Sequence, residues 1–198
     1  MKLCVFQGTF NPFHNAHIRL AEYTINKYNF DSLLFIPAYK PPHKKCDESI
    51  AMHRLNMTKL AVNDVNNPKF DVSDIEYQRN EKSYTYITIC ELYKIYKPEG
   101  KIHFIIGTDA FNKIESWYES DKLKDILKFI VFERENNFDF DKYEYLKQKG
   151  YDFITETLEF NDISSTELRE LIKNGKDYTN YVNIRVKEYI ENYGLYKI

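Results

Sequence analysis

The chain has 198 residues, of which 43% are hydrophobic and 29% charged, and its formal net charge is −2. This is the composition of a globular protein with a real core, and the charge argues against nucleic-acid binding driven by bulk electrostatics. The three cysteines form no Cys-x-x-Cys pair, no apolar run reaches the roughly 18 residues of a membrane span, and the first apolar run is too short for a signal peptide. We therefore expect a soluble, cytoplasmic protein.

Short apolar runs alternate with segments of helical periodicity along most of the chain. Strands connected by helices of this length imply β-α-β crossovers, and hence a Rossmann-like α/β fold: a doubly wound parallel sheet with helices on both faces. We expect a single domain over residues 1–198, with a small helical C-terminal part at about 160–198. Strands are predicted at 2–6, 32–36, 70–73, 102–106, 129–132 and 153–155, and helices at 16–28, from Ser83 to about residue 95, and at the end of the chain.

The first candidate site follows the first strand, where a glycine turn at Gly8–Phe10 leads into a helix. His14 and His17 lie at i and i+3, so they share one face of that helix start. Backbone N–H groups and the positive helix end favour an anion there, which suggests phosphate chemistry. The alternatives are an ordinary strand-to-helix turn with Asn15 as its N-cap, and a zinc site that lacks its remaining ligands.

A second group of polar residues opens a helix in the last third of the chain. Ser164 and Glu167 form a capping-box pattern, which could explain Ser164 as helix initiation alone. That explanation leaves out the further hydroxyls of Ser165 and Thr166 and the guanidinium of Arg169. Together with free backbone N–H groups, these side chains suit a polyphosphate.

Two other motifs fall where the carboxyl edge of the predicted sheet should lie, and a third opens a predicted helix. Lys44 belongs to a basic loop after the second strand, which could equally be a solvated loop. Gly107 and Asp109 follow the fourth strand, where an Asp can meet a ribose or act as an N-cap. Trp117 could stack on a planar ring or pack in the core. The segment Ser83–Thr85 opens a helix, and capping by Ser83 would explain it fully.

Taken together, these residues resemble the nucleotidylyltransferase superfamily with a T/H-x-G-H signature, and most closely the nicotinate-nucleotide adenylyltransferases. The resemblance covers residues 1 to about 195, and the motifs occur in the family's order. The matching residues are Gly8, Thr9, Phe10, Pro12, His14 and His17 for G-G-T-F-D-P-x-H-x-G-H; Ile163, Ser164, Ser165, Thr166 and Arg169 for I-S-S-T-x-x-R; and Pro41–Lys44, Ser83–Thr85 with Thr88, and Gly107, Asp109 and Trp117 for the nicotinate branch.

Three positions depart from the family pattern. Gln7 replaces the first Gly of the opening motif, Asn11 replaces an Asp, and Ala16 replaces the Gly of H-x-G-H. Gln7 could narrow the approach of the nucleotide or only close the strand. None of the three removes a phosphate-binding side chain, so we expect activity to be retained.

The resemblance implies transfer of the adenylyl group of ATP to nicotinate mononucleotide, which gives nicotinate adenine dinucleotide and pyrophosphate. It implies Mg²⁺ held mainly by phosphates and water, and no nucleic-acid or membrane partner. The rivals are another acceptor phosphate, a silent nucleotide-binding module and a metal-binding protein; a homo-oligomer is left open. The implied ATP-binding residues are Gly8, Thr9, Phe10, His14, His17, Gly107, Asp109, Ser164, Ser165, Thr166 and Arg169, of which His14, His17 and Arg169 are catalytic; the implied nicotinate mononucleotide-binding residues are Lys44, Ser83, Tyr84, Thr85 and Trp117.

Overall fold

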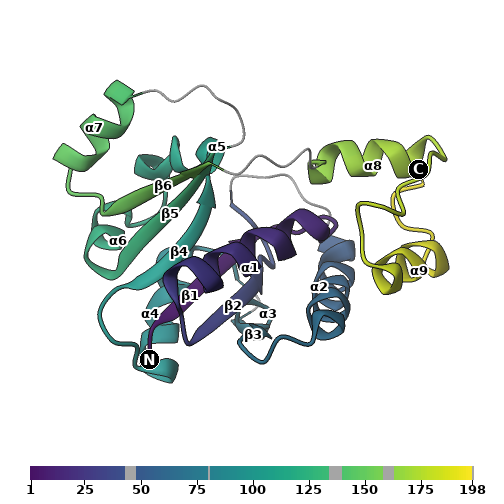
Figure 1. Cartoon of the computed structure of the whole chain (residues 1–198), viewed down its shortest axis with the longest axis horizontal. Helices are drawn as coiled ribbons and strands as arrows, with labels where there is room; N and C mark the ends of the chain where they lie inside the picture. Colours follow the sequence, from purple (N-terminus) through teal and green to yellow (C-terminus); the bar gives the residue numbers. More distant parts are fainter. Residues whose placement is uncertain (43–47, 80, 134–139, 158–162, 198) are drawn as a thin grey trace.

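The computed structural model describes residues 1–42, 48–79, 81–133, 140–157 and 163–197. In these residues six parallel strands form one sheet in the order β3-β2-β1-β4-β5-β6, between two layers of helices (Figure 1). The strands are β1 (Leu3–Gly8), β2 (Ser32–Pro37), β3 (Phe70–Val72), β4 (Ile102–Gly107), β5 (Leu127–Glu133) and β6 (Phe153–Thr157).

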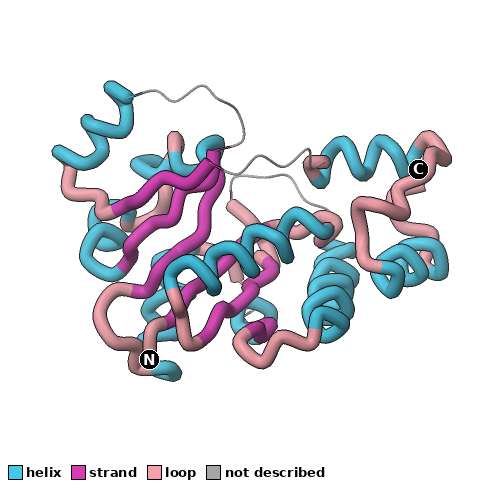
Figure 2. Tube along the Cα trace, in the orientation of Figure 1, coloured by secondary structure: helices cyan, strands magenta, loops and turns pink. Residues whose placement is uncertain are grey.

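Helices and short helical turns follow most of the strands along the chain (Figure 2). They are α1 (Asn15–Tyr28), α2 (Ala51–Val65), α3 (Ile75–Arg79), α4 (Thr85–Tyr96), α5 (Thr108–Phe111), α6 (Ser120–Ile126), α7 (Phe140–Gln148), α8 (Ser165–Lys173) and α9 (Ile184–Asn192), with 3₁₀ turns η1 (Glu48–Ile50) and η2 (Ile114–Ser116).

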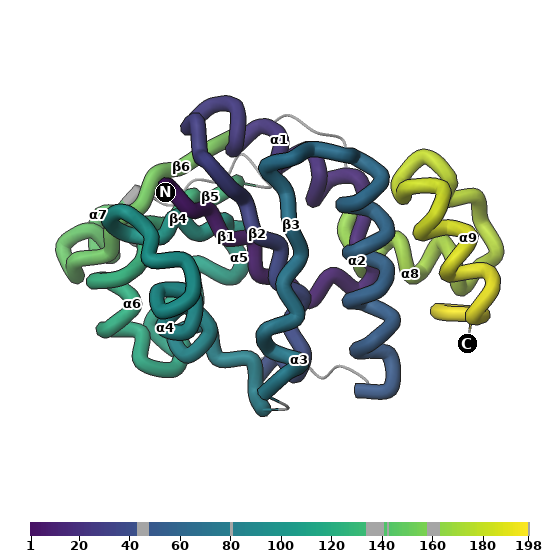
Figure 3. Tube along the Cα trace, turned by 90° about the horizontal axis from the view of Figure 1, so that it is seen from below, coloured from purple at the N-terminus to yellow at the C-terminus, as the bar shows by residue number. Residues whose placement is uncertain are grey.

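The sheet is buried on both faces because successive side chains of a strand point to opposite sides. On β1, Cys4 and Phe6 join a core cluster with side chains of α1, α2, α8 and α9. Leu3 and Val5 join the other cluster, with side chains of α3 to α7. Figure 3 shows this division, with α9 beside α2. The doubly wound parallel sheet predicted from the sequence is therefore confirmed.

The strand order reverses between β1 and β4, since β1 pairs with β2 on one side and with β4 on the other. Ligands of open α/β sheets bind outside the carboxyl ends of the strands at such a switch point. Gly8 and Gly107, the last residues of β1 and β4, lie at that edge. The loops that follow these two strands therefore border this switch point.

The helix that carries His17 is tied to the edge strand β6 through one buried carboxylate. Glu156 accepts hydrogen bonds from Tyr23 Oη at 2.6 Å, from Lys27 Nζ at 2.7 Å and from Tyr28 Oη, all on α1. Burial works against ionisation, but these donors outweigh it, so the pKa of the Glu156 carboxyl is lowered. These hydrogen bonds from Tyr23, Lys27 and Tyr28 attach α1 to the edge strand β6.

Candidate active site

The loop after β1 places the ring of Phe10 directly against Gly8. Phe10 has a left-handed backbone conformation (φ 48°), and its buried ring packs against Phe6, Phe13 and His17. A Cβ atom on Gly8 would lie 2.6 Å from Phe10 Cε1. Gly8 is therefore required by the close approach of this ring, which lies in the core.

We expect Gly8→Ala to lower the free energy of unfolding by about 2 kcal/mol, because the ring it meets cannot move without displacing its neighbours. Urea denaturation measures this change. The matched control is Gly107→Ala, where an added Cβ meets nothing within 4 Å, so that variant should be at least as stable as the wild type. Equal stability of Gly8→Ala and the wild type would contradict the placement of Phe10.

The two histidines lie at the start of α1 and are both buried. His14 is the N-cap, so the alternative in which Asn15 is the N-cap is wrong; Asn15 is the first helical residue, and its N–H donates to the Tyr181 carbonyl at 2.8 Å. The His14 N–H donates to His17 Nδ1 at 3.1 Å, and the two ring centroids lie 3.8 Å apart. Because Nδ1 accepts, the neutral His17 ring carries its proton on Nε2, which makes Nε2–H a donor.

Helix α8 begins beside the loop after β1, although the two are far apart in sequence. Ser164 is its N-cap: it accepts from the Glu167 N–H at 3.2 Å and donates to Glu167 Oε2 at 2.7 Å, so the capping box is confirmed. The next hydroxyl, on Ser165, donates to the Pro12 carbonyl at 3.1 Å. The hydroxyl of Ser164 is thus engaged within its own helix, whereas that of Ser165 reaches the β1 loop.

Arg169 makes the second link between α8 and the β1 loop. Its Nη1 donates to the Asn11 carbonyl at 2.7 Å across 158 residues of sequence, and to the Ser165 carbonyl at 3.1 Å. Its Nη2 donates to Thr166 Oγ1 at 3.2 Å. From the C-terminal side, Tyr196 Oη also donates to Asn11 Oδ1 at 2.7 Å. The two phosphate-type motifs predicted from the sequence therefore lie side by side.

Arg54 on α2 is a residue of this region that the sequence analysis did not identify. It is fully buried, and its Nη1 donates to the Thr9 carbonyl at 2.9 Å and to the Ala38 carbonyl at 2.5 Å, while Nη2 donates to the Tyr39 carbonyl at 3.0 Å. Within the described ranges, no carboxylate forms an ion pair with it. Arg54 thus joins the loops that follow β1 and β2.

The loop after β4 brings the third predicted group to the same edge. Gly107 is the N-cap of α5 and Asp109 lies within the helix, exposed, so the alternative of Asp109 as an N-cap is wrong. Trp117 follows η2, is half-buried and meets the Phe104 ring edge-on, with centroids 6.2 Å apart. It is therefore neither fully in the core nor free in solvent.

The segment Ser83–Thr85 lies between the β2 loop and α4. The prediction that Ser83 caps the helix is wrong: Tyr84 is the N-cap, and Ser83 Oγ instead accepts from the Lys40 N–H at 2.9 Å. The Tyr84 ring contacts the ring of Tyr118, with centroids 4.7 Å apart. This contact brings the start of α4 beside the segment that carries Trp117.

The remaining predictions concern the basic loop after β2 and the alternative of a metal site. Lys44 lies outside the described residues; its neighbour in the same loop, Lys40, pairs with Glu48 Oε2 at 3.0 Å, which raises the pKa of Lys40. Over the described part of the chain, no three His, Cys, Asp or Glu side chains gather as metal ligands. In that same part, no helix has the length and apolar character needed to cross a membrane.

Known proteins resemble this chain over nearly its whole length. The model of the cytidylyltransferase-like family matches residues 5–171. A protein of Caldicellulosiruptor bescii described as a probable nicotinate-nucleotide adenylyltransferase is 36% identical over 200 residues and 100% of both chains. A protein of Clostridium tetani with the same description is 36% identical over 204 residues and 99% of both chains. The chain belongs to the nicotinate-nucleotide adenylyltransferase family.

Solved structures show the same fold in another member of this family. The Plasmodium falciparum nicotinic acid mononucleotide adenylyltransferase complexed with NaAD superposes with a TM-score of 0.80 at 24% identity, over 98% of this chain and 97% of that one. The chain is thus a nucleotidyltransferase of the nicotinate-nucleotide adenylyltransferase family with a Rossmann-like fold.

Proposed function

We propose that the chain transfers the adenylyl group of Mg-ATP to the 5′-phosphate of nicotinate mononucleotide. An oxygen of that phosphate forms the new bond to the α-phosphorus, and the bond to pyrophosphate breaks, which gives nicotinate adenine dinucleotide. The observation that carries the proposal is the junction of the His14–His17 turn with α8, through Arg169 to Asn11 at 2.7 Å and Ser165 to Pro12 at 3.1 Å. It brings together two helix starts, and the N-terminus of a helix favours an anion.

In this proposal the phosphate chemistry belongs to these two helix starts. His17, as an Nε2–H donor, and His14 stabilise charge on the α-phosphate and on the departing pyrophosphate. Ser165, Thr166 and Arg169 bind the β- and γ-phosphates. The attacking phosphate is already an anion at neutral pH, so positioning and charge stabilisation suffice and no side-chain base is required.

The nucleosides would bind at the loops after β4 and before α4. Gly107 and Asp109 would meet the adenosine ribose, and Trp117 would stack on the pyridine ring. The segment Ser83–Thr85 would recognise the nicotinate carboxylate, and Lys44 would contact the mononucleotide phosphate. We also propose that residues 1–198 act as one domain, since α8 and α9 share a core cluster with α1 and α2.

The experiment is pyrophosphate release from Mg-ATP, with nicotinate mononucleotide and nicotinamide mononucleotide compared at equal concentrations. We expect release with the acid, and a preference for it over the amide. Equal use of both would retain adenylyl transfer but remove the carboxylate site. No release with either acceptor would contradict the proposed function.

A further inference from the structure

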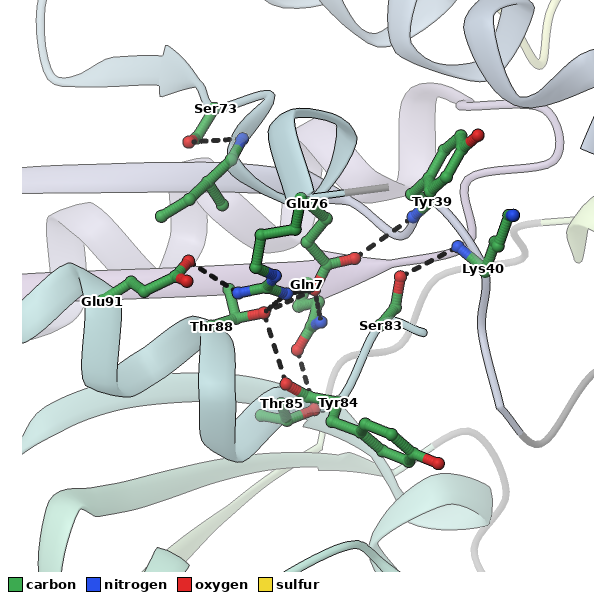
Figure 4. A network of polar contacts seen from close by, with 12 residues as sticks. Gln7, Tyr39, Lys40, Ser73, Glu76, Ser83, Tyr84, Thr85, Thr88 and Glu91 are labelled. Carbon is green, nitrogen blue, oxygen red and sulfur yellow. Dashed lines mark hydrogen bonds and ion pairs between the residues drawn. The ribbon is translucent and has the colours of Figure 1, made fainter. Parts of the chain in front are cut away.

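The side chain of Gln7 lies at the end of β1, between Glu76 of α3 and Thr85 of α4 (Figure 4). Gln7 Nε2 donates to Glu76 Oε1 at 2.5 Å, and Gln7 Oε1 accepts from Thr85 Oγ1 at 2.8 Å. The family motif has a glycine at this position, which could make neither contact. The bridge is therefore a feature of this chain's own sequence, and it ends on a hydroxyl at the start of α4.

Glu76 determines which way the amide of Gln7 points. Its side chain is fully buried, and it accepts hydrogen bonds from Gln7, from Thr88 Oγ1 at 2.7 Å and from the Tyr39 N–H at 3.1 Å. An ionised carboxylate can only accept, so Gln7 must turn its NH₂ group toward Glu76. The amide oxygen is then left for Thr85, and the Thr85 hydroxyl must donate its proton to it.

The other end of the network supports the same direction. Arg79 Nη2 donates to Thr88 Oγ1 at 2.8 Å and lies 3.9 Å from Glu76 Oε1, while Arg79 Nη1 pairs with Glu91 at 2.6 Å. Because a guanidinium only donates, Thr88 accepts from Arg79 and its own O–H donates to Glu76 at 2.7 Å, the Tyr84 carbonyl being a more distant acceptor at 3.3 Å. The hydrogen bonds therefore converge on Glu76 from both sides, and each has a defined direction.

The consequence for the substrate follows from the single proton of a hydroxyl. With that proton committed to Gln7, the Thr85 hydroxyl can only accept from a ligand. A carboxylate offers no proton, whereas a carboxamide offers an NH₂ donor. We infer that Gln7 is a specificity residue that acts through Thr85: it makes this hydroxyl an acceptor and thereby reduces discrimination in favour of the acid. The inference rests on the proposed function, and it leaves recognition of the carboxylate to the backbone N–H groups of α4.

The test compares kcat/KM for nicotinate and nicotinamide mononucleotide in the wild type and in Gln7→Met, which keeps the length of the side chain but removes both hydrogen bonds. We expect the acid-to-amide ratio of kcat/KM to rise about tenfold, because a tenfold change corresponds to the free energy of one hydrogen bond. The control is Gln78→Met, the same change on the exposed side of α3, where Nε2 donates to Asp74 Oδ1 at 2.8 Å; its ratio should equal that of the wild type. If Gln7→Met does not fold, Gln7→Gly supplies the same readout.

Adding Thr85→Val to the wild type and to Gln7→Met distinguishes a role of Gln7 in specificity from a merely structural one. In the wild type it should lower use of the amide more than use of the acid, and in Gln7→Met it should abolish the tenfold gain. A fall in both kcat/KM values at a constant ratio in Gln7→Met would overturn the inference while the proposed function stands. If the wild type forms no product from either acceptor, the proposed function itself fails, and the inference fails with it.

Discussion

Replacing His17 by alanine should lower kcat for adenylyl transfer by at least ~100-fold, the effect of removing one preorganised donor to developing charge. The His14 N–H donates to His17 Nδ1 at 3.1 Å, so Nε2–H is the donor that this substitution removes. The measurement is pyrophosphate release at saturating Mg-ATP and nicotinate mononucleotide. The melting temperature of the variant is recorded alongside, because the His17 ring also packs against Phe10 and Phe13.

The matched control for this prediction is His53→Ala. His53 lies on α2, where its Nδ1 is 3.0 Å from Tyr189 Oη of α9, and it is not among the residues proposed to bind substrate. It should keep the wild-type kcat. A folded His17→Ala variant with nearly wild-type turnover would show that the imidazole does not stabilise the transferred phosphate, and the catalytic role would then have to be withdrawn.

Arg54→Met should lower the free energy of unfolding by about 3 kcal/mol, because three carbonyls lose a buried charged donor. These carbonyls belong to Thr9, Ala38 and Tyr39, so the loops after β1 and β2 lose their shared anchor. Urea denaturation gives the stability change, and KM for Mg-ATP should rise in the same variant. Arg54→Lys should recover only part of both losses, since an ammonium lacks the planar fork that reaches separate carbonyls.

Arg185→Met is the matched control. Arg185 is exposed on α9 and pairs with Asp64 Oδ1 at 3.0 Å, and an exposed pair of this kind adds little stability. Its denaturation midpoint should stay near that of the wild type. If Arg54→Met were as stable as this control, the buried guanidinium would have no structural role of the kind described.

Strands β1, β2, β4 and β5 could be predicted because each is an apolar run that both faces of the sheet bury, whereas β3 and β6 at the two edges are shorter apolar signals that include exposed residues. Helix α2 is a different case. Its buried positions include Arg54 and Thr58 beside Leu55 and Val62, and a charge and a hydroxyl interrupt the apolar periodicity. Thr58 donates to the Arg54 carbonyl of its own helix, whereas Arg54 is buried because carbonyls of the β1 and β2 loops accept from its guanidinium. The Arg54 partnership depends on the tertiary fold.

The arrangement of the candidate site likewise could not be predicted from local sequence patterns. The sequence analysis identified the histidine turn and the α8 start as separate motifs, but their junction depends on Arg169 and Asn11, which are 158 residues apart. Ser83 follows the local rule for a cap, yet the Lys40 backbone 43 residues away occupies its hydroxyl. Gln7 could be noted as a departure from the family, whereas its partners Glu76 and Thr85 became known only from the structure.

The contacts of the C-terminal helices with the β1 loop have a dynamic consequence. Tyr196 and Arg169 contact Asn11, and the Asn15 N–H reaches the Tyr181 carbonyl, so a transient detachment of α8 and α9 would dismantle the proposed phosphate site while the sheet stays folded. A nucleotide that binds both halves opposes this opening by mass action. The backbone amides of α9 should then exchange their hydrogens more slowly when Mg-ATP is bound, although α9 itself supplies none of the proposed phosphate-binding residues.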